Sequence, residues 1–137
     1  MIFIDTGAFV GRYVERDQFH DAAVAIWAEL SLNPQRCFTS NLVLSETLTL
    51  LARRTDYRFA AERARLIYSS IALQILRPEE PDEAAAVLLL EKYAGQRVSF
   101  CDCESFVLMK KYGLTHAFTF DGHFTAAGFQ TLPAVQS

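Results

Sequence analysis

Short apolar runs alternate with longer helical stretches along the chain, and this alternation restricts the possible folds most strongly. The runs are rich in β-branched and aromatic residues, and the stretches between them repeat apolar residues at helical spacing. Strands separated by helices predict an α/β fold, with a parallel sheet covered by helices on both faces. We expect strands at 2–4, 37–40, 73–76, 117–120 and 130–132, a helix or turn at 8–10, and helices at 19–32, 42–53, 57–70, 83–93 and 100–112.

Polar residues and glycine mark the expected ends of several helices. Asn41, Asp82 and Ser99 are expected N-caps, because a short side chain with an oxygen accepts a free N–H group of the first turn. Gly113 is expected to end the helix that Ser99 begins, in a left-handed conformation. Pro81 is expected to lie in the loop before Asp82.

The composition fits a single domain over residues 1–137. Three cysteines, an odd number, argue against a disulfide framework and favour a reducing, cytoplasmic environment. The longest strictly apolar run, 84–90, is far shorter than the roughly 20 residues of a membrane helix, and no secretory signal is evident. We therefore expect no membrane association.

The overall charge does not by itself indicate a nucleic-acid-binding protein. The formal net charge is −3, although ten of the 13 basic residues are arginine, which binds phosphate well through its forked guanidinium. If some of the acids hold a metal ion, the remaining surface is close to neutral. The net charge therefore neither supports nor excludes binding of a nucleic acid.

Four acidic residues lie where apolar runs end or are interrupted. Asp5 and Asp121 each close an apolar run, Asp102 follows one, and Glu46 interrupts one. All four map to the carboxyl edge of the predicted sheet, where ligands bind in folds of this kind. A divalent cation with oxygen ligands would hold four like charges together, so we expect a metal site there.

Each acid also has a structural alternative. Asp5 could be a helix N-cap, and Asp102 could favour the dipole of a helix that it begins. Asp121, followed by Gly122, could form a turn. Glu46 has apolar helical neighbours, so a buried arginine could pair with it. The joint position of the four acids favours a common site.

Several other polar residues lie near these acids in sequence. The hydroxyl groups of Thr6, Ser99 and Thr119 could bond a carboxylate or a metal-bound water, and Ser99 could equally be a cap. His123, two residues after Asp121, is expected at the rim of the site as a packing or surface residue.

Three further residues receive no expected role. Cys101 and Cys103 flank Asp102, but the chain lacks further cysteines and histidines at the spacing of a zinc site, and one thiol turned inward is the simpler reading. Glu104 adds a fifth acid nearby.

The acids occur within a recognisable order of short motifs. These are Ile2-Phe3-Ile4-Asp5-Thr6, then Ser45-Glu46 inside an apolar helix, Ser99-Phe100-Cys101-Asp102 at a helix start, and Thr119-Phe120-Asp121 followed by Phe124. In this order the chain resembles PIN-domain ribonucleases and is most similar to the VapC-type toxins of prokaryotic toxin–antitoxin pairs. The resemblance covers essentially the whole chain.

This resemblance implies a three-layer α/β/α sandwich with a short central parallel sheet, and one or two Mg²⁺ or Mn²⁺ ions. The implied reaction is hydrolysis of single-stranded RNA to 5′-phosphate and 3′-hydroxyl ends. Asp5, Glu46 and Asp102 would be the core ligands, and Asp121 would bind a second ion or position the water.

Two alternative functions keep the same fold: a stand-alone PIN-domain nuclease for RNA processing, and a PIN-like binding module without catalysis. Two other classes with acids at strand ends fit the sequence less well. A receiver domain needs adjacent acids after its first strand and a late lysine, and a haloacid-dehalogenase-type phosphatase needs an aspartate at Gly7.

Two protein partners are expected. The apolar composition, with excess hydrophobic residues at 42–54 and 82–93, predicts a homodimer, and members of the resembled family commonly pair. An antitoxin would insert a basic side chain into the acidic pocket and place apolar anchors in a groove between helices.

Overall fold

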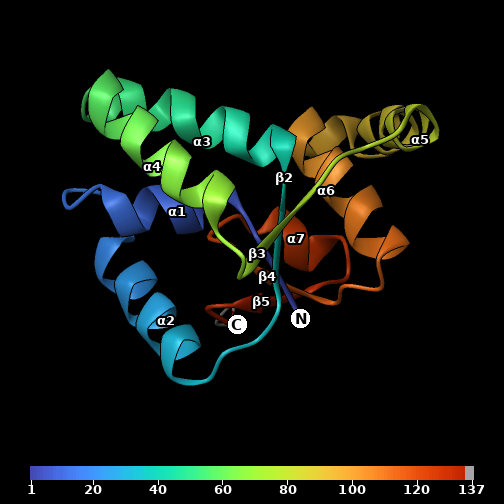
Figure 1. The fold of residues 1–137 in the computed structure, drawn as a ribbon. Helices are drawn as coiled ribbons and strands as arrows, with labels where there is room; N and C mark the ends of the chain where they lie inside the picture. Colours follow the sequence, from blue (N-terminus) through green and yellow to red (C-terminus); the bar gives the residue numbers. More distant parts are fainter. Residues whose placement is uncertain (135–137) are drawn as a thin grey trace.

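A five-stranded parallel sheet forms the centre of the molecule, in a computed structural model that describes residues 1–134 (Figure 1). Helices surround this sheet. The elements in order are β1 (Ile2–Ile4), α1 (Thr6–Tyr13), α2 (His20–Leu32), β2 (Cys37–Ser40), α3 (Asn41–Arg54), α4 (Tyr57–Ser69), β3 (Leu73–Leu76), α5 (Glu80–Lys92), the 3₁₀ helix η1 (Ala94–Gln96), α6 (Phe100–Lys111), β4 (His116–Phe118), α7 (His123–Ala126) and β5 (Gln130–Leu132).

The strand order is β3-β2-β1-β4-β5, and every neighbouring pair is parallel. The chain builds the sheet outward from β1 to β3 and then returns to place β4 on the other side of β1. Helices α1 to α4 connect the strands on the β1-to-β3 side, and α5 to α7 belong to the return of the chain to β4 and β5. The two sets of helices cover the sheet, so the predicted three-layer α/β/α sandwich is confirmed. The direction reverses between β1 and β4, which is where sheets of this type form their binding crevice.

Strand β1 lies at the centre of the core because it has neighbours on both sides and helices on both faces. Ile2, Phe3 and Ile4 have no exposed surface. A continuous apolar run is typical of such a strand. Helices α1 and α2 pack closely because Gly11 has no side chain: a Cβ there would lie 2.8 Å from the Cβ of Ala23.

The sequence predicted four of the five strands within one residue of their observed ends. The predicted strand 117–120 is wrong at its end, because β4 stops at Phe118 and the Thr119 hydroxyl accepts a hydrogen bond from the Asp121 N–H instead. The turn that follows contains α7, which the sequence did not predict. The segment between the expected helices 83–93 and 100–112 contains η1, and the short expected helix at 8–10 extends over the whole of α1.

Two predicted N-caps are wrong. Ser40, not Asn41, caps α3, because Ser40 is extended and its hydroxyl accepts the Val43 N–H at 3.1 Å. Glu79, not Asp82, caps α5, with Asp82 completing the capping box from inside the helix.

Two other predicted helix signals have clear outcomes. Pro81 lies in the first turn of α5 rather than in a loop, at a position where its missing N–H costs nothing. Ser99 caps α6 as predicted, and Gly113 follows that helix with φ +69°.

No helix in residues 1–134 combines the length and the apolar character needed to cross a lipid bilayer.

Candidate active site

All four acids identified in the sequence line one pocket of about 660 Å³. Asp5 directly follows β1, and Asp121 lies three residues beyond β4, so these two neighbouring strands bring together two acids that are far apart in the sequence. Asp102 comes from the start of α6 and Glu46 from α3. The pocket therefore lies at the carboxyl edge of the sheet, where the strand order reverses.

The environment of Asp5 does not support a capping role. Asp5 occupies the N-cap position of α1 but makes no side-chain capping hydrogen bond. Its carboxylate instead accepts the hydroxyl of Thr119 at 2.7 Å, within the protein interior. Burial, together with repulsion from Asp121 and Glu46, raises the pKa of Asp5 to about 6, although the Thr119 hydrogen bond opposes this rise.

Asp102 lies in the first turn of α6, where the hydroxyl of Ser99 accepts its backbone N–H at 3.0 Å. Burial first, and then the charges of Asp5 and Asp121, raise the pKa of Asp102 to about 8. A helix N-terminus alone would lower the pKa of a carboxyl group. The neighbouring acids and the loss of solvent therefore outweigh the helix dipole.

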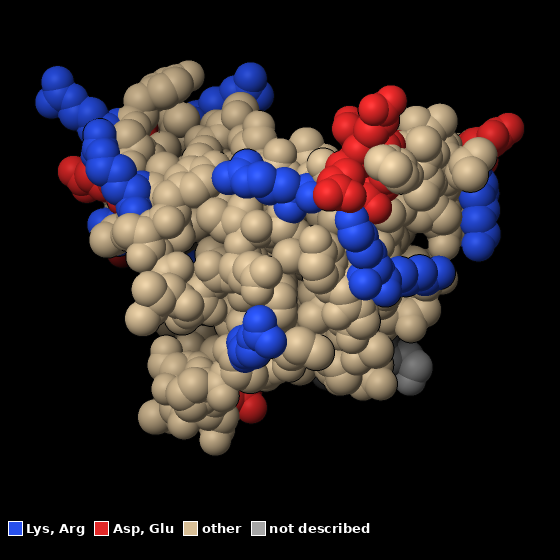
Figure 2. Space-filling view, turned by 45° about the vertical axis from the view of Figure 1, so that its right-hand side comes forward, with Lys and Arg blue, Asp and Glu red and all other residues tan. Residues whose placement is uncertain are grey.

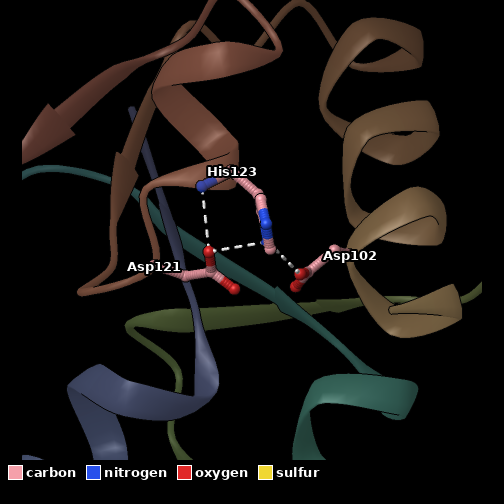
Figure 3. A group of neighbouring side chains, drawn as sticks. All are labelled: Asp102, Asp121 and His123. Atoms are coloured by element: carbon pink, nitrogen blue, oxygen red, sulfur yellow. Dashed lines mark hydrogen bonds and ion pairs between the residues drawn. The ribbon is translucent and has the colours of Figure 1, made fainter. Parts of the chain in front are cut away.

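Figure 3 shows the imidazole of His123 lying between two carboxylates of the pocket. Its Nδ1 is 3.0 Å from Oδ1 of Asp121 and 3.7 Å from Oδ2 of Asp102. The backbone N–H of His123 also donates to Asp121 Oδ1 at 2.9 Å. The expectation that His123 is only a packing or surface residue at the rim is therefore wrong.

Glu46 differs from the other three acids, because its side chain is exposed to the pocket rather than buried in an apolar helix. It lies in the second turn of α3. Within residues 1–134 it forms no ion pair, so the alternative of a buried arginine partner is not observed. The hydroxyl of Thr6 lies 3.5 Å from Glu46 Oε2.

The three supporting hydroxyl groups have different functions. Thr119 connects two acids, because its hydroxyl donates to Asp5 and accepts the backbone N–H of Asp121 at 3.0 Å. Ser99 acts as a cap, and its oxygen is occupied by the N–H of Asp102. Thr6 is the one of the three that lies nearest to Glu46.

The donor atoms of the pocket fit a divalent cation. One ligand atom each from Asp102, Asp121 and His123 lie within 4.8 Å of one another. The buried carboxylate of Asp5 lines the same pocket, where burial and the neighbouring acids raise its pKa. Carboxylate oxygens are the ligands that hard divalent cations prefer.

Arginines lie on the rim of this acidic pocket. Arg54 is paired with Asp17, with Nη1 and Oδ1 2.6 Å apart. Arg97, in the loop before α6, forms no ion pair within the described residues and has φ 55° and ψ 38°. A residue other than glycine in this conformation is strained, and such residues concentrate at functional sites.

Cys101, Cys103 and Glu104, the residues near Asp102 for which no role was predicted, do not line the acidic pocket. Burial raises the pKa of the Cys101 and Cys103 thiols, and the three cysteines are free, so neither thiol is activated. Glu104 is fully buried, and its carboxylate oxygens have no hydrogen-bond partner. Its nearest charges belong to Asp82 and Glu83 at the start of α5, so it does not belong to the acidic pocket.

A three-layer fold with a parallel sheet, and with acids that converge at the crevice between β1 and β4, characterises a known family of protein domains. The chain belongs to the PIN-domain family, because residues 2–130 match the model of that domain. It is 38% identical to the 23S rRNA-specific endonuclease VapC20 of Mycobacterium tuberculosis over 129 residues, which cover 94% of this chain and 95% of that protein. The resemblance to VapC-type toxins is thereby confirmed.

Solved structures agree with this assignment. The crystal structure of M. tuberculosis VapC20, described as a sarcin–ricin loop cleaving toxin, superposes with a TM-score of 0.85 at 35% identity, covering 94% of this chain and 96% of the other. The crystal structure of FitAcB from Neisseria gonorrhoeae gives a TM-score of 0.69 at 22% identity and 96% coverage of both chains. At that identity the second similarity shows the fold alone.

Proposed function

We propose that this protein is a metal-dependent endoribonuclease that hydrolyses phosphodiester bonds in single-stranded RNA, and that it is the toxin of a toxin–antitoxin pair. The observation that supports this most strongly is the meeting of four acids from distant segments in one pocket of a PIN domain. The relative VapC20 is described as a 23S rRNA-specific endonuclease and as a toxin that cleaves the sarcin–ricin loop, which favours a loop of ribosomal RNA as the substrate. We further propose that residues 1–137 form one domain, which works in the cytoplasm.

The proposed site uses Mg²⁺ or Mn²⁺, held directly or through water by Asp5, Glu46, Asp102 and Asp121, with His123 beside two of these acids as a further candidate ligand. Such an ion supplies a water of lowered pKa and neutralises charge on the phosphate. Thr119 fixes Asp5 relative to Asp121, so the carboxylates need little rearrangement on binding. Burial of Asp5 and Asp102 strengthens every electrostatic interaction within the pocket.

The test is cleavage of purified 23S rRNA by the purified protein in millimolar Mn²⁺, compared with EDTA. We expect discrete cuts that carry 5′-phosphate ends and disappear in EDTA. Cleavage by a protein whose gene has no antitoxin gene beside it would favour the stand-alone nuclease, and RNA binding without any cleavage would favour the binding module.

An antitoxin is the proposed protein partner, and a second pocket provides a place for its apolar residues. This groove of about 430 Å³ lies among α1, α2, α4 and β3, and is lined by Phe9, Trp27, Leu30, Leu66 and Ile67 among others. Leu66 is 57% exposed there. Amphipathic peptide segments bind such grooves through regularly spaced apolar anchors.

We therefore expect Leu66→Glu to weaken the antitoxin complex by roughly 10-fold or more, because it places a charge where an apolar anchor would be buried. RNA cleavage by the free variant should be unchanged. Binding of the protein encoded beside this chain's gene can be followed by calorimetry. Equal affinity for the parent and the variant would contradict this groove as the docking site.

A homodimer is proposed through α5. This helix is apolar on more than its inner face: Ala86 is buried, yet Val87 and Leu88 are 54% and 67% exposed. In Figure 2, where the side of the molecule carrying α5 and α6 has come forward, acidic side chains gather at the upper right and uncharged residues, polar and apolar alike, cover most of the centre, so the apolar character of α5 rests on the exposed Val87 and Leu88. Exposed apolar surface of this kind marks interaction sites.

We expect Leu88→Glu to convert the dimer into a monomer at micromolar concentration, because it buries a charge in the interface. Light scattering after size exclusion gives the mass directly. Leu32→Glu, at an 81% exposed leucine on α2, is the matched control and should leave the dimer intact. A monomeric parent protein would disprove the proposal.

A further inference from the structure

The rim of the acidic pocket carries a pair of stacked phenylalanines for which the metal chemistry has no use. The rings of Phe19 and Phe120 have centroids 4.5 Å apart and planes within 5° of parallel. Both residues line the same pocket as the acids. Since Phe120 immediately precedes Asp121, the stack begins beside one of the proposed metal ligands.

Phe120 is the inner member of this pair and Phe19 the outer one. Phe120 packs edge-on against Phe118, with centroids 6.1 Å apart, and its ring lies 3.5 Å from where a Cβ on Gly7 would be. Phe19, in contrast, keeps 37% of its surface exposed. The stack therefore extends from the core to an open aromatic surface at the mouth of the pocket.

Hydrogen bonds hold the segment that carries Phe19 in place. The N–H of Phe19 donates to Oδ2 of Asp17 at 3.0 Å, and Oδ1 of the same carboxylate accepts Nη1 of Arg54 on α3 at 2.6 Å. The carbonyl of Phe19 accepts the N–H of Ala23 on α2 at 2.9 Å. The ring is thus positioned by contacts with two helices before any ligand arrives.

We propose that Phe19 is a stacking platform for one base of the RNA, at a nucleotide next to the phosphodiester bond that the acids address. This inference rests on the proposed ribonuclease function and adds a substrate-positioning residue to it. An aromatic ring cannot bind phosphate, but it matches the face of an unpaired base, and proteins hold single-stranded RNA in this way. Stacking is tolerant of base identity, so Phe19 selects an unpaired nucleotide rather than a particular base.

Binding of abasic oligonucleotides tests this inference without relying on cleavage. RNA oligonucleotides that span the cleavage site, each lacking one base, are titrated against Asp102→Asn protein and followed by fluorescence anisotropy. We expect removal of one particular base to weaken binding roughly 5- to 150-fold, the range for the loss of one aromatic stack. Phe19→Ala should weaken binding of intact RNA by a similar factor and abolish the effect of removing that base.

Two further variants distinguish stacking from general damage. Phe19→Tyr keeps the ring and should retain parental binding. Tyr112→Ala removes a comparably exposed aromatic residue (42%) just after the far end of α6 from Asp102, and should have no effect. Melting curves confirm that each variant is folded.

Parental affinity of Phe19→Ala for intact RNA would overturn the proposal, as would an unchanged pattern of losses across the abasic series. If Phe19 contacts a protein partner instead of RNA, Phe19→Ala would likewise bind intact RNA with parental affinity. Failure of the ribonuclease function itself is recognised separately, because the parent protein would then not cleave RNA in Mn²⁺.

Discussion

Replacing Asp102 with asparagine is expected to reduce RNA cleavage by roughly 100-fold or more, the loss seen when one charge-stabilising group is removed from an active site. The same substitution should raise the melting temperature of the metal-free protein by roughly 3–10 °C. Both effects follow from one cause: the carboxylate is buried beside Asp5 and Asp121, where its charge is unfavourable until a cation binds. Calorimetry in EDTA and a cleavage assay in Mn²⁺ measure the two effects.

Asp82 provides a matched control for this substitution. It occupies the third position of α5, as Asp102 does in α6, and the two are similarly buried. The backbone N–H of Glu79 and the Lys111 ammonium, however, lower the pKa of Asp82. Asp82→Asn should therefore lower the melting temperature and leave cleavage unchanged. If Asp102→Asn is destabilised like Asp82→Asn, or if it cleaves at the parental rate, Asp102 has a structural role instead.

The metal-free protein is expected to lose stability as the pH rises from about 4 to about 8. Asp5 and Asp102 have pKa values of about 6 and about 8 in the folded chain, compared with 3.8 for an ordinary carboxyl group. Between these values the folded chain binds more protons than the unfolded chain, so the free energy of unfolding falls with increasing pH. For Asp5 the change from 3.8 to about 6 corresponds to about 3 kcal/mol.

Manganese should reverse this trend, because it binds the deprotonated carboxylates. At an ion concentration 100 times the dissociation constant, binding adds about 2.7 kcal/mol, or roughly 5–10 °C in melting temperature. We expect this gain at about pH 8 and little gain at about pH 5. Thermal melts in EDTA and in Mn²⁺ across this range provide the measurement. A pH-independent melting temperature in EDTA, or equal stabilisation by Mn²⁺ at both ends, would contradict a site built from these carboxylates.

The sequence predicted the fold well because its signals were local and repeated. Each strand is a short apolar run and each long helix carries its own apolar pattern, so the alternation predicted the parallel sheet directly. The meeting of Asp5 with Asp121 could also be expected, because ends of parallel strands share one edge of the sheet. Their roles as metal ligands stay a prediction until the substitutions are made.

What the sequence could not predict depends on distances between segments. Asp82 and Asp102 have similar local sequence positions, and only the approach of Lys111 to one and of two carboxylates to the other separates their chemistry. His123 was assigned to the rim because α7, which turns its ring back between two acids, is a single short turn without a periodic signal.

The hydrogen bond from Thr119 to Asp5 joins residues 114 positions apart. A nascent chain on the ribosome therefore contains Asp5 well before Thr119, and cannot assemble the pocket until β4 and the turn after it have been synthesised and have left the exit tunnel. Contacts over such long separations form late and slowly in folding. The proposed ribonuclease site is therefore incomplete until the segment that carries β4 and Asp121 has folded against β1.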